Sequence, residues 1–269
     1  MHQTFSKLLS SVCQVHQNYV PSCLPVRTKA ILNNLIDTTL HFQVSTYQKY
    51  AEDEGWKPTP LNFRRHFKSL DGKIIFLPKE KLYVLFYNSD RLAERKKWTI
   101  AHELGHYFCG HLLQNYLTPP ASPEAAKQRE QEQEAEANRF ARCLLAPPWL
   151  LVKAAGRYGR KDVVAFYALC RCIFRLSQEA SYFVARNTAS TFREYGVHSL
   201  HKHWDIMHRK YHLILSTALY TLFPTCQDFD SLVRAYNHEY DMLNYLHTYG
   251  KLGTLMRGPY SMAQCMGLY

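Results

Sequence analysis

The chain has 269 residues, of which 46% are hydrophobic, which is enough to bury a sizeable core in one domain with an extension. Its N-terminus lacks the uninterrupted apolar core of a signal peptide. Its most apolar later run, residues 211–223, is too short and too rich in Ser and Thr to span a bilayer. We therefore expect neither export nor membrane insertion. The chain has eight cysteines without the spacing of a disulfide framework, which favours a cytoplasmic protein with reduced thiols. Its formal net charge of +11 requires anionic partners to be considered.

The N-terminal part of the chain divides into a polar stretch and a helical one. Residues 1–27 are polar and contain two prolines, so we expect a loose N-terminal arm. In residues 28–42, Ile31, Leu35 and Ile36 recur with helical spacing. The pattern therefore predicts a helix across residues 28–42.

A β-hairpin is predicted next. Residues 74–77 and 82–87 are β-branched and aromatic runs on either side of a Pro-Lys-Glu-Lys turn. A sheet edge beside an active-site helix can hold an extended peptide by strand addition, so the hairpin is a candidate substrate platform. A hairpin that serves only as a scaffold explains the pattern equally well.

The stretch "TIAHELGHYFCGH", residues 99–111, has the spacing of a metal site. On a helix that advances about 100° per residue, His102 and His106 lie about 40° apart, so both imidazoles can reach one ion. Glu103 lies on the neighbouring edge, where it can hold a water molecule bound to that ion. His111 would point about 140° away from His106 on a continued helix and is excluded as a ligand. Because the motif also arises by chance in amphipathic helices, the third ligand must come from elsewhere.

A second helix offers that third ligand. Residues 117–133 begin as a Pro-rich loop that could act as a flap, and they become a charged helix start. In residues 132–147 an apolar stripe with helical spacing follows, made of Ala137, Phe140, Ala141, Leu144 and Leu145. Glu134 lies at the edge of this stripe and can complete a two-His, one-Glu site, with Asn138 one turn on as a hydrogen-bond partner of a ligand histidine. Glu136 is the competing ligand, and we favour Glu134 because Glu136 points toward solvent.

These two segments resemble a known family. "WTIAHELGHYFCGH" followed by "EAEANRFARCLLAP" is similar to the ImmA/IrrE family of zinc metallopeptidases, over roughly residues 30–150. The resemblance implies that His102, His106 and Glu134 bind Zn²⁺ and that Glu103 is the general base. It also implies a protein substrate of the regulatory kind, notably helix-turn-helix repressors of mobile elements or stress responses.

The predicted fold is α+β: a mainly helical, zincin-like metallopeptidase domain with a small β-sheet or hairpin beside the metal-binding helix, followed by a helical C-terminal extension. We divide the chain into an arm (1–27), the metallopeptidase domain (28–150), a basic helical segment (151–196) and an extension of unknown role (197–269).

Positive charge is concentrated in residues 139–193, which hold ten Lys or Arg and two acids, so eight of the net +11 lies there. Clustered cations bind phosphates by counterion release, so nucleic acid is one possible partner. An acidic protein substrate or simple solubility explains the charge as well, and we favour that interpretation because no base-reading helix is recognised.

The C-terminal extension carries a cluster of histidines, at positions 198, 201, 203, 208 and 212. His208 and His212 are again four residues apart. Because no carboxylate lies near them on the same helix face, we do not favour a second metal site there.

The sequence therefore predicts a zinc-dependent endopeptidase that cleaves a regulatory protein, with a transcriptional repressor as the expected substrate and no membrane partner. The alternative is a regulator that binds DNA or protein and has a structural or vestigial zinc site. The intact Glu103 favours the peptidase, since a structural site needs no general base and closes its fourth position with a protein ligand.

Overall fold

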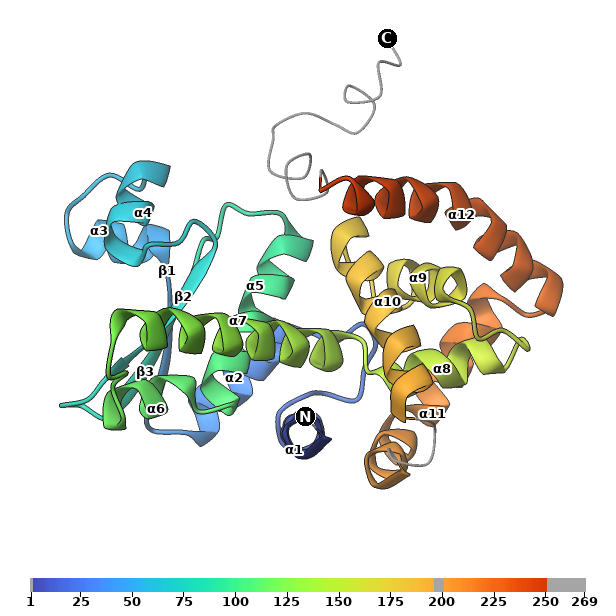
Figure 1. Cartoon of the computed structure of the whole chain (residues 1–269), viewed down its shortest axis with the longest axis horizontal. Helices are drawn as coiled ribbons and strands as arrows, with labels where there is room; N and C mark the ends of the chain where they lie inside the picture. The colour runs from blue at the N-terminus through green and yellow to red at the C-terminus, as the bar shows by residue number, and fades with distance from the viewer. Residues whose placement is uncertain (1, 196–200, 251–269) are drawn as a thin grey trace, which may run out of the picture. The chain divides into compact units, whose positions relative to one another are not determined.

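Three short strands interrupt a largely helical chain (Figure 1). The computed structural model describes residues 2–195 and 201–250. Over these residues the predicted α+β class is confirmed, mainly helical with one small sheet. No helix in the described part of the chain is long and apolar enough to cross a membrane.

Among the described residues, the first unit comprises 2–147 and 201–214. Its helices are α1 (His2–Asn18), α2 (Thr28–Thr38), α3 (Tyr47–Asp53), α4 (Pro60–Phe67), α5 (Ala93–Phe108), α6 (His111–Leu117), α7 (Pro123–Leu145) and the first part of α11 (His201–Leu222). Its strands are β1 (Phe42–Thr46), β2 (Gly72–Leu77) and β3 (Leu82–Tyr87).

The sheet has the strand order β1-β3-β2. β2 and β3 pair antiparallel, which confirms the predicted hairpin, and β1 pairs parallel with β3. The predicted helix over 28–42 is too long: α2 ends at Thr38, and Phe42 begins β1. The reason is non-local, because β1 forms by pairing with a strand about forty residues downstream, with Phe42 opposite Tyr83.

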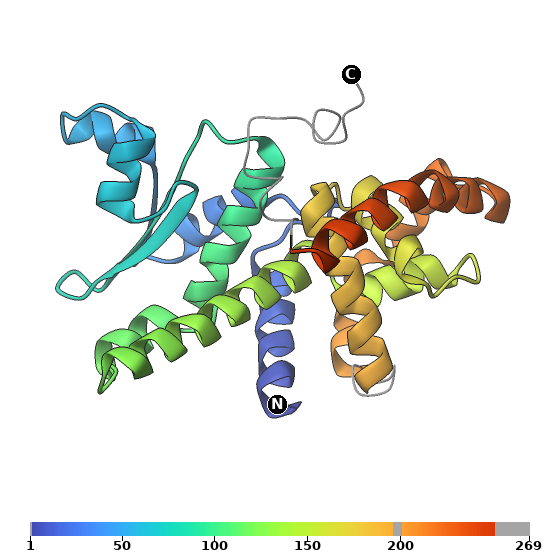
Figure 2. The same cartoon turned by 45° about the horizontal axis from the view of Figure 1, so that its top comes forward.

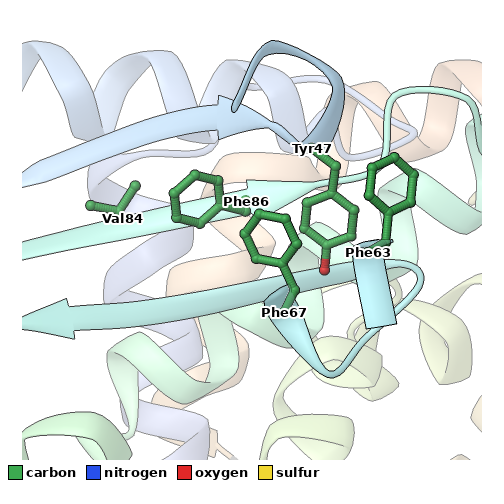
Figure 3. Close-up of a cluster of buried hydrophobic side chains, with 5 residues drawn as sticks. All are labelled: Tyr47, Phe63, Phe67, Val84 and Phe86. Carbon is green, nitrogen blue, oxygen red and sulfur yellow. The ribbon is translucent and has the colours of Figure 1, made fainter. Parts of the chain in front are cut away.

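One face of the sheet is covered by an aromatic cluster (Figure 3). Val84 and Phe86 of β3 pack there against Tyr47 of α3 and the two phenylalanines of α4, Phe63 and Phe67. The rings of Tyr47 and Phe67 stack with their centres 4.0 Å apart. This packing anchors the hairpin and leaves β2 at the edge of the sheet, on the side toward α5.

The expected loose arm is instead largely a packed helix. α1 places Leu8, Val12 and Val15 on one buried face with helical spacing, and it packs against α7 (Figure 1, Figure 2). The two prolines lie beyond the end of α1 at Asn18 and therefore do not interrupt it.

Among the described residues, the second unit comprises 148–195 and 215–250. Its helices are α8 (Pro148–Gly156), α9 (Val163–Cys172), α10 (Gln178–Tyr195), the last part of α11 and α12 (Cys226–Thr248). α9 is central, since α8, α10 and α12 all pack on it. Tyr167 of α9 donates a hydrogen bond to Glu239 of α12, whose carboxylate also pairs with Arg171 Nε at 3.3 Å.

Acid should destabilise the first unit through His16 of α1. Its Nδ1 lies 2.8 Å from the Tyr211 hydroxyl, and complete burial, assisted by the charge of Lys210, lowers the pKa of His16 to about 3. An unfolded histidine titrates near pH 6.5. Below about pH 6.5, His16 therefore binds a proton in the unfolded chain but stays neutral in the folded chain. The stabilisation is therefore complete above about pH 6.5 and is lost progressively as the pH falls toward about 3.

The measurement is denaturant unfolding at pH 7 and pH 5 for the wild type and for His16→Gln. The free energy of unfolding of the wild type should fall by about 2 kcal/mol more than that of the variant. Equal losses in the two proteins would contradict the assignment to His16.

Candidate metal centre

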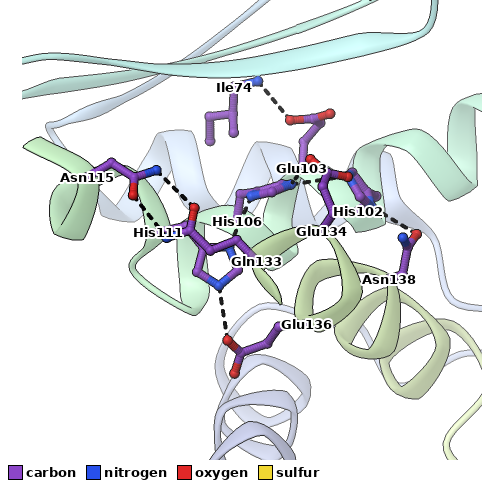
Figure 4. A network of polar contacts seen from close by, with 10 residues as sticks. All are labelled: Ile74, His102, Glu103, His106, His111, Asn115, Gln133, Glu134, Glu136 and Asn138. Carbon is purple, nitrogen blue, oxygen red and sulfur yellow. Dashed lines mark hydrogen bonds and ion pairs between the residues drawn. The ribbon is translucent and has the colours of Figure 1, made fainter. Parts of the chain in front are cut away.

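The centre is built where α5 and α7 cross closely. A Cβ atom added to Gly105 of α5 would lie 2.9 Å from both the Cα and the carbonyl oxygen of Ala137 on α7, which is closer than real Cβ contacts. Glycine therefore permits this backbone approach. The predicted apolar stripe of α7 is confirmed, since all five of its residues are buried. Glu134 lies about one turn before Ala137 and is thereby held over the two histidines of α5 (Figure 4).

Three ligand atoms meet at this crossing. The Nε2 atoms of His102 and His106 lie 3.2 Å apart, and each lies 3.3 Å from a different carboxylate oxygen of Glu134. A tetrahedral ion with bonds of about 2.0 to 2.1 Å holds its ligand atoms about 3.3 to 3.4 Å apart. The three side chains therefore form a group that could hold one metal ion.

The electrostatics of this group favour a cation between the side chains. Hydrogen bonds from His102 and His106 hold the pKa of Glu134 well below its usual range, despite its partial burial. Burial acts to lower the pKa of His102, but the hydrogen bond to Glu134 and the nearby carboxylates raise it overall. A metal ion between the side chains could supply the positive charge that this arrangement favours.

Glu103 is buried beside the group but is not a member of it. Its Oε2 accepts a hydrogen bond of 2.8 Å from the backbone N–H of Ile74, in the edge strand β2 (Figure 4). β2 can approach α5 because residue 72 is glycine: a Cβ there would collide with the side chain of Thr99. A cavity of about 330 Å³ adjoins the site, with Glu103, His106 and Glu134 in its wall.

The other ring nitrogen of each histidine also has a partner. Asn138 Oδ1 lies 3.1 Å from His102 Nδ1, and His111 Nδ1 lies 3.0 Å from His106 Nδ1. Glu136, the competing third ligand, lies elsewhere: its Oε2 is 3.1 Å from His111 Nε2. The structure thus places Glu134, and not Glu136, against the two histidines of the motif.

The contact of His111 with His106 differs from the prediction, because the helix does not continue through residue 111. α5 ends at Phe108, Gly110 has the left-handed conformation with φ of 75°, and α6 begins at His111. The turn brings the buried His111 back toward His106. The glycine between Cys109 and His111 is the sequence signal that indicates this turn.

The segment considered as a flap is largely helical. α7 begins at Pro123, where Ser122 caps it, so residues 118–122 alone remain a loop. Gln133 is buried and holds α6 to α7: its Oε1 accepts from Asn115 Nδ2 at 2.9 Å, and its Nε2 donates to Gln114. These bonds fix the wall of the cavity that α6 provides.

The C-terminal histidines form no comparable group among the residues that the structure describes. The rings of His208 and His212 stack with their centres 5.1 Å apart. His198 and the side chains of His201 and His203 lie outside the described residues.

Comparison with protein families supports the predicted resemblance. Residues 62–182, from α4 into α10, match the family model Peptidase_M78, described as the IrrE N-terminal-like domain. The match includes all three members of the metal group. A search of curated proteins found no match to the chain.

Gly105→Ala should separate α5 from α7 and weaken metal binding. Overpacking costs about 1 to 3 kcal/mol, which exceeds the gain of about 1 kcal/mol that alanine brings to a helix interior. Denaturant unfolding and zinc titration measure the two effects. The matched control is Gly156→Ala at the end of α8, where an added Cβ would meet no atom within 4 Å. An unchanged zinc affinity in Gly105→Ala would show that the crossing does not set the ligand spacing.

Proposed function

We propose that the protein is a zinc-dependent endopeptidase that cleaves a regulatory protein, because residues 62–182 match the IrrE N-terminal-like domain of the M78 metallopeptidases. The observation that carries the proposal is the spacing of 3.2 to 3.3 Å among two imidazole nitrogens and a carboxylate, with a second carboxylate buried beside them.

In this proposal His102, His106 and Glu134 bind Zn²⁺. Two imidazoles and one carboxylate are a ligand set that Zn²⁺ accepts, and three protein ligands leave a fourth position open, as in catalytic sites. Asn138 orients His102 by accepting a hydrogen bond from Nδ1–H, which leaves Nε2 for the ion. A structural site would instead close its fourth position with a protein side chain.

Glu103 acts as the general base. When bound, Zn²⁺ polarises a peptide carbonyl and lowers the pKa of water. The N–H of Ile74 holds Glu103 Oε2, which leaves Oε1 to accept the proton of the attacking water. Glu103 then donates that proton to the amine that leaves when the peptide bond breaks.

The edge of β2 binds the substrate backbone. Ladder bonds alternate along a strand, so Phe76 presents its N–H and C=O to the same side as the N–H of Ile74, away from β3. Among the described strands, β2 has no second neighbour on that side. An extended peptide added there would run past Glu103 and the metal group, which favours the platform over the scaffold interpretation.

The substrate that we propose is a helix-turn-helix repressor, as the resemblance to the ImmA/IrrE family implies, and the proposed location is the cytoplasm. The eight cysteines of the sequence lack the spacing of a disulfide framework, which supports a reducing compartment.

The nucleic-acid alternative gains no support from the second unit. Arg160, one of its cations, pairs with Asp162 at 2.6 Å and with Asp230 at 2.8 Å, and Arg171 pairs with Glu239. Cations engaged in this way are poorly placed to neutralise phosphates. Some of the basic residues of the second unit are therefore explained by ion pairs within that unit.

Glu134→Ala should remove most zinc affinity, because it deletes one of three ligands. The loss of zinc affinity should be larger than the loss of about 10- to 100-fold that follows removal of an outer partner of a metal site. Glu132→Ala, an exposed change on the same helix, is the control and should bind zinc normally. Metal analysis and competitive titration provide the measurement. A greater loss in Glu136→Ala than in Glu134→Ala would transfer the ligand role to Glu136.

Glu103→Gln should retain zinc and lose peptidase activity, since an amide keeps the size of the side chain but cannot accept the proton. Positioned general bases contribute about 10²- to 10⁴-fold in rate. The test is incubation of the zinc-loaded wild type and variant with a helix-turn-helix repressor encoded beside the gene, with cleavage followed by mass spectrometry. A variant that keeps zinc and full biological activity would exclude peptide hydrolysis and support the regulator.

A further inference from the structure

We propose that His111 and Glu136 are positioning residues that fix the protonation of His106 and so direct its Nε2 toward the metal. The inference rests on the proposed function, in which His106 is a zinc ligand. It assigns a role to two side chains that are not ligands themselves.

The three side chains form one continuous chain of contacts. His106 Nδ1 lies 3.0 Å from His111 Nδ1, and His111 Nε2 lies 3.1 Å from Glu136 Oε2 (Figure 4). His111 is 2% exposed, so water is not a ready substitute for either partner. A buried nitrogen without a partner is costly, and both of its ring nitrogens are satisfied here.

The positions of the protons follow from these contacts. A neutral imidazole that binds a metal through Nε2 carries its proton on Nδ1, so His106 must donate to His111 Nδ1. His111 can accept there only if its own proton is on Nε2. Glu136, which as a carboxylate is an acceptor, receives that proton in a hydrogen bond. Each donor therefore faces one acceptor. Because Glu136 can only accept, it sets the direction of both hydrogen bonds.

The same proton positions disfavour a second metal ion. Cys109, His111 and Glu136 lie close enough together to hold one. An ion on His111 Nε2 would require a proton on His111 Nδ1, which would then face the Nδ1–H of His106. Two donors would oppose each other across 3.0 Å, unless His111 lost both of its protons. With a metal on His106, the contacts favour a hydrogen bond between His111 and Glu136.

The two ligand histidines are thus supported differently. His102 faces the amide oxygen of Asn138, which is always an acceptor. His106 faces another imidazole, which can accept or donate. Glu136 removes that ambiguity, and this is why the glutamate that does not bind the metal is still part of the site.

The test is titration of metal-free protein with Co²⁺, followed by visible absorption. His111→Phe fills the space but offers no acceptor, and Co²⁺ affinity should fall by about 10- to 100-fold, the range for outer partners of a metal site. His111→Gln offers a carbonyl oxygen to His106 and should restore most of the affinity and the wild-type spectrum. A residue with a merely structural role would not show this dependence on an acceptor. Thermal unfolding of the metal-free proteins checks that the variants fold.

Cys109→Ser is the matched control and should bind one Co²⁺ per chain with wild-type affinity. Binding of two ions by the wild type and one by Cys109→Ser would overturn the inference in favour of a second metal site. Unchanged affinity in His111→Phe would overturn it while leaving the proposed function intact. A wild type that binds no Co²⁺ or Zn²⁺ would refute the proposed function and the inference together.

Nitrogen-15 NMR of the histidines in the zinc-loaded wild type decides the point even if His111→Phe does not fold. We expect a protonated Nδ1 on His106 and a protonated Nε2 on His111. A protonated Nδ1 on His111 would overturn the inference.

Discussion

The backbone contact between Gly105 and Ala137 is the constraint on which the candidate centre depends. α5 supplies both histidines and the buried Glu103, whereas the third member of the metal group, Glu134, comes from α7. Each residue along a helix adds about 1.5 Å and about 100°, so a shift of α7 by one residue would carry Glu134 off the histidines. The same shift would remove Asn138 from His102. One glycine therefore sets the register of two helices and, through it, the composition of the site.

The residues of the site that sequence reasoning identified all lie on regular helices. His102 and His106 meet because a spacing of four returns to one face, and Glu134 was preferred over Glu136 from its place beside the apolar stripe of α7. His111 was misjudged because its position depends on Gly110, whose left-handed conformation ends one helix and starts another. Helical spacing carries no information across such a turn.

The fold shows the same division between local and non-local information. The β2–β3 hairpin was predictable because its two strands are adjacent in the chain and share one turn. β1 was not, since its partner is β3, about forty residues on, and its short run follows directly on a helical pattern. α1 was not predicted for another reason. Leu8, Val12 and Val15 recur with helical spacing, but many polar residues lie between them and prolines follow, so the stretch was interpreted as an arm.

The hydrogen bond between Ile74 and Glu103 ties the alignment of the sheet to the proposed chemistry. Successive residues of an edge strand turn their amides alternately toward the neighbouring strand and away from it. Ile74 faces Glu103 only while it lies opposite Leu85. If an inserted residue in the turn at 78–81 slid β2 by one position, the amide at this point would turn into the ladder. Glu103 would then lose the group that orients it. The length of the turn therefore sets the orientation of the carboxylate, and the chemistry proposed for Glu103 constrains that length.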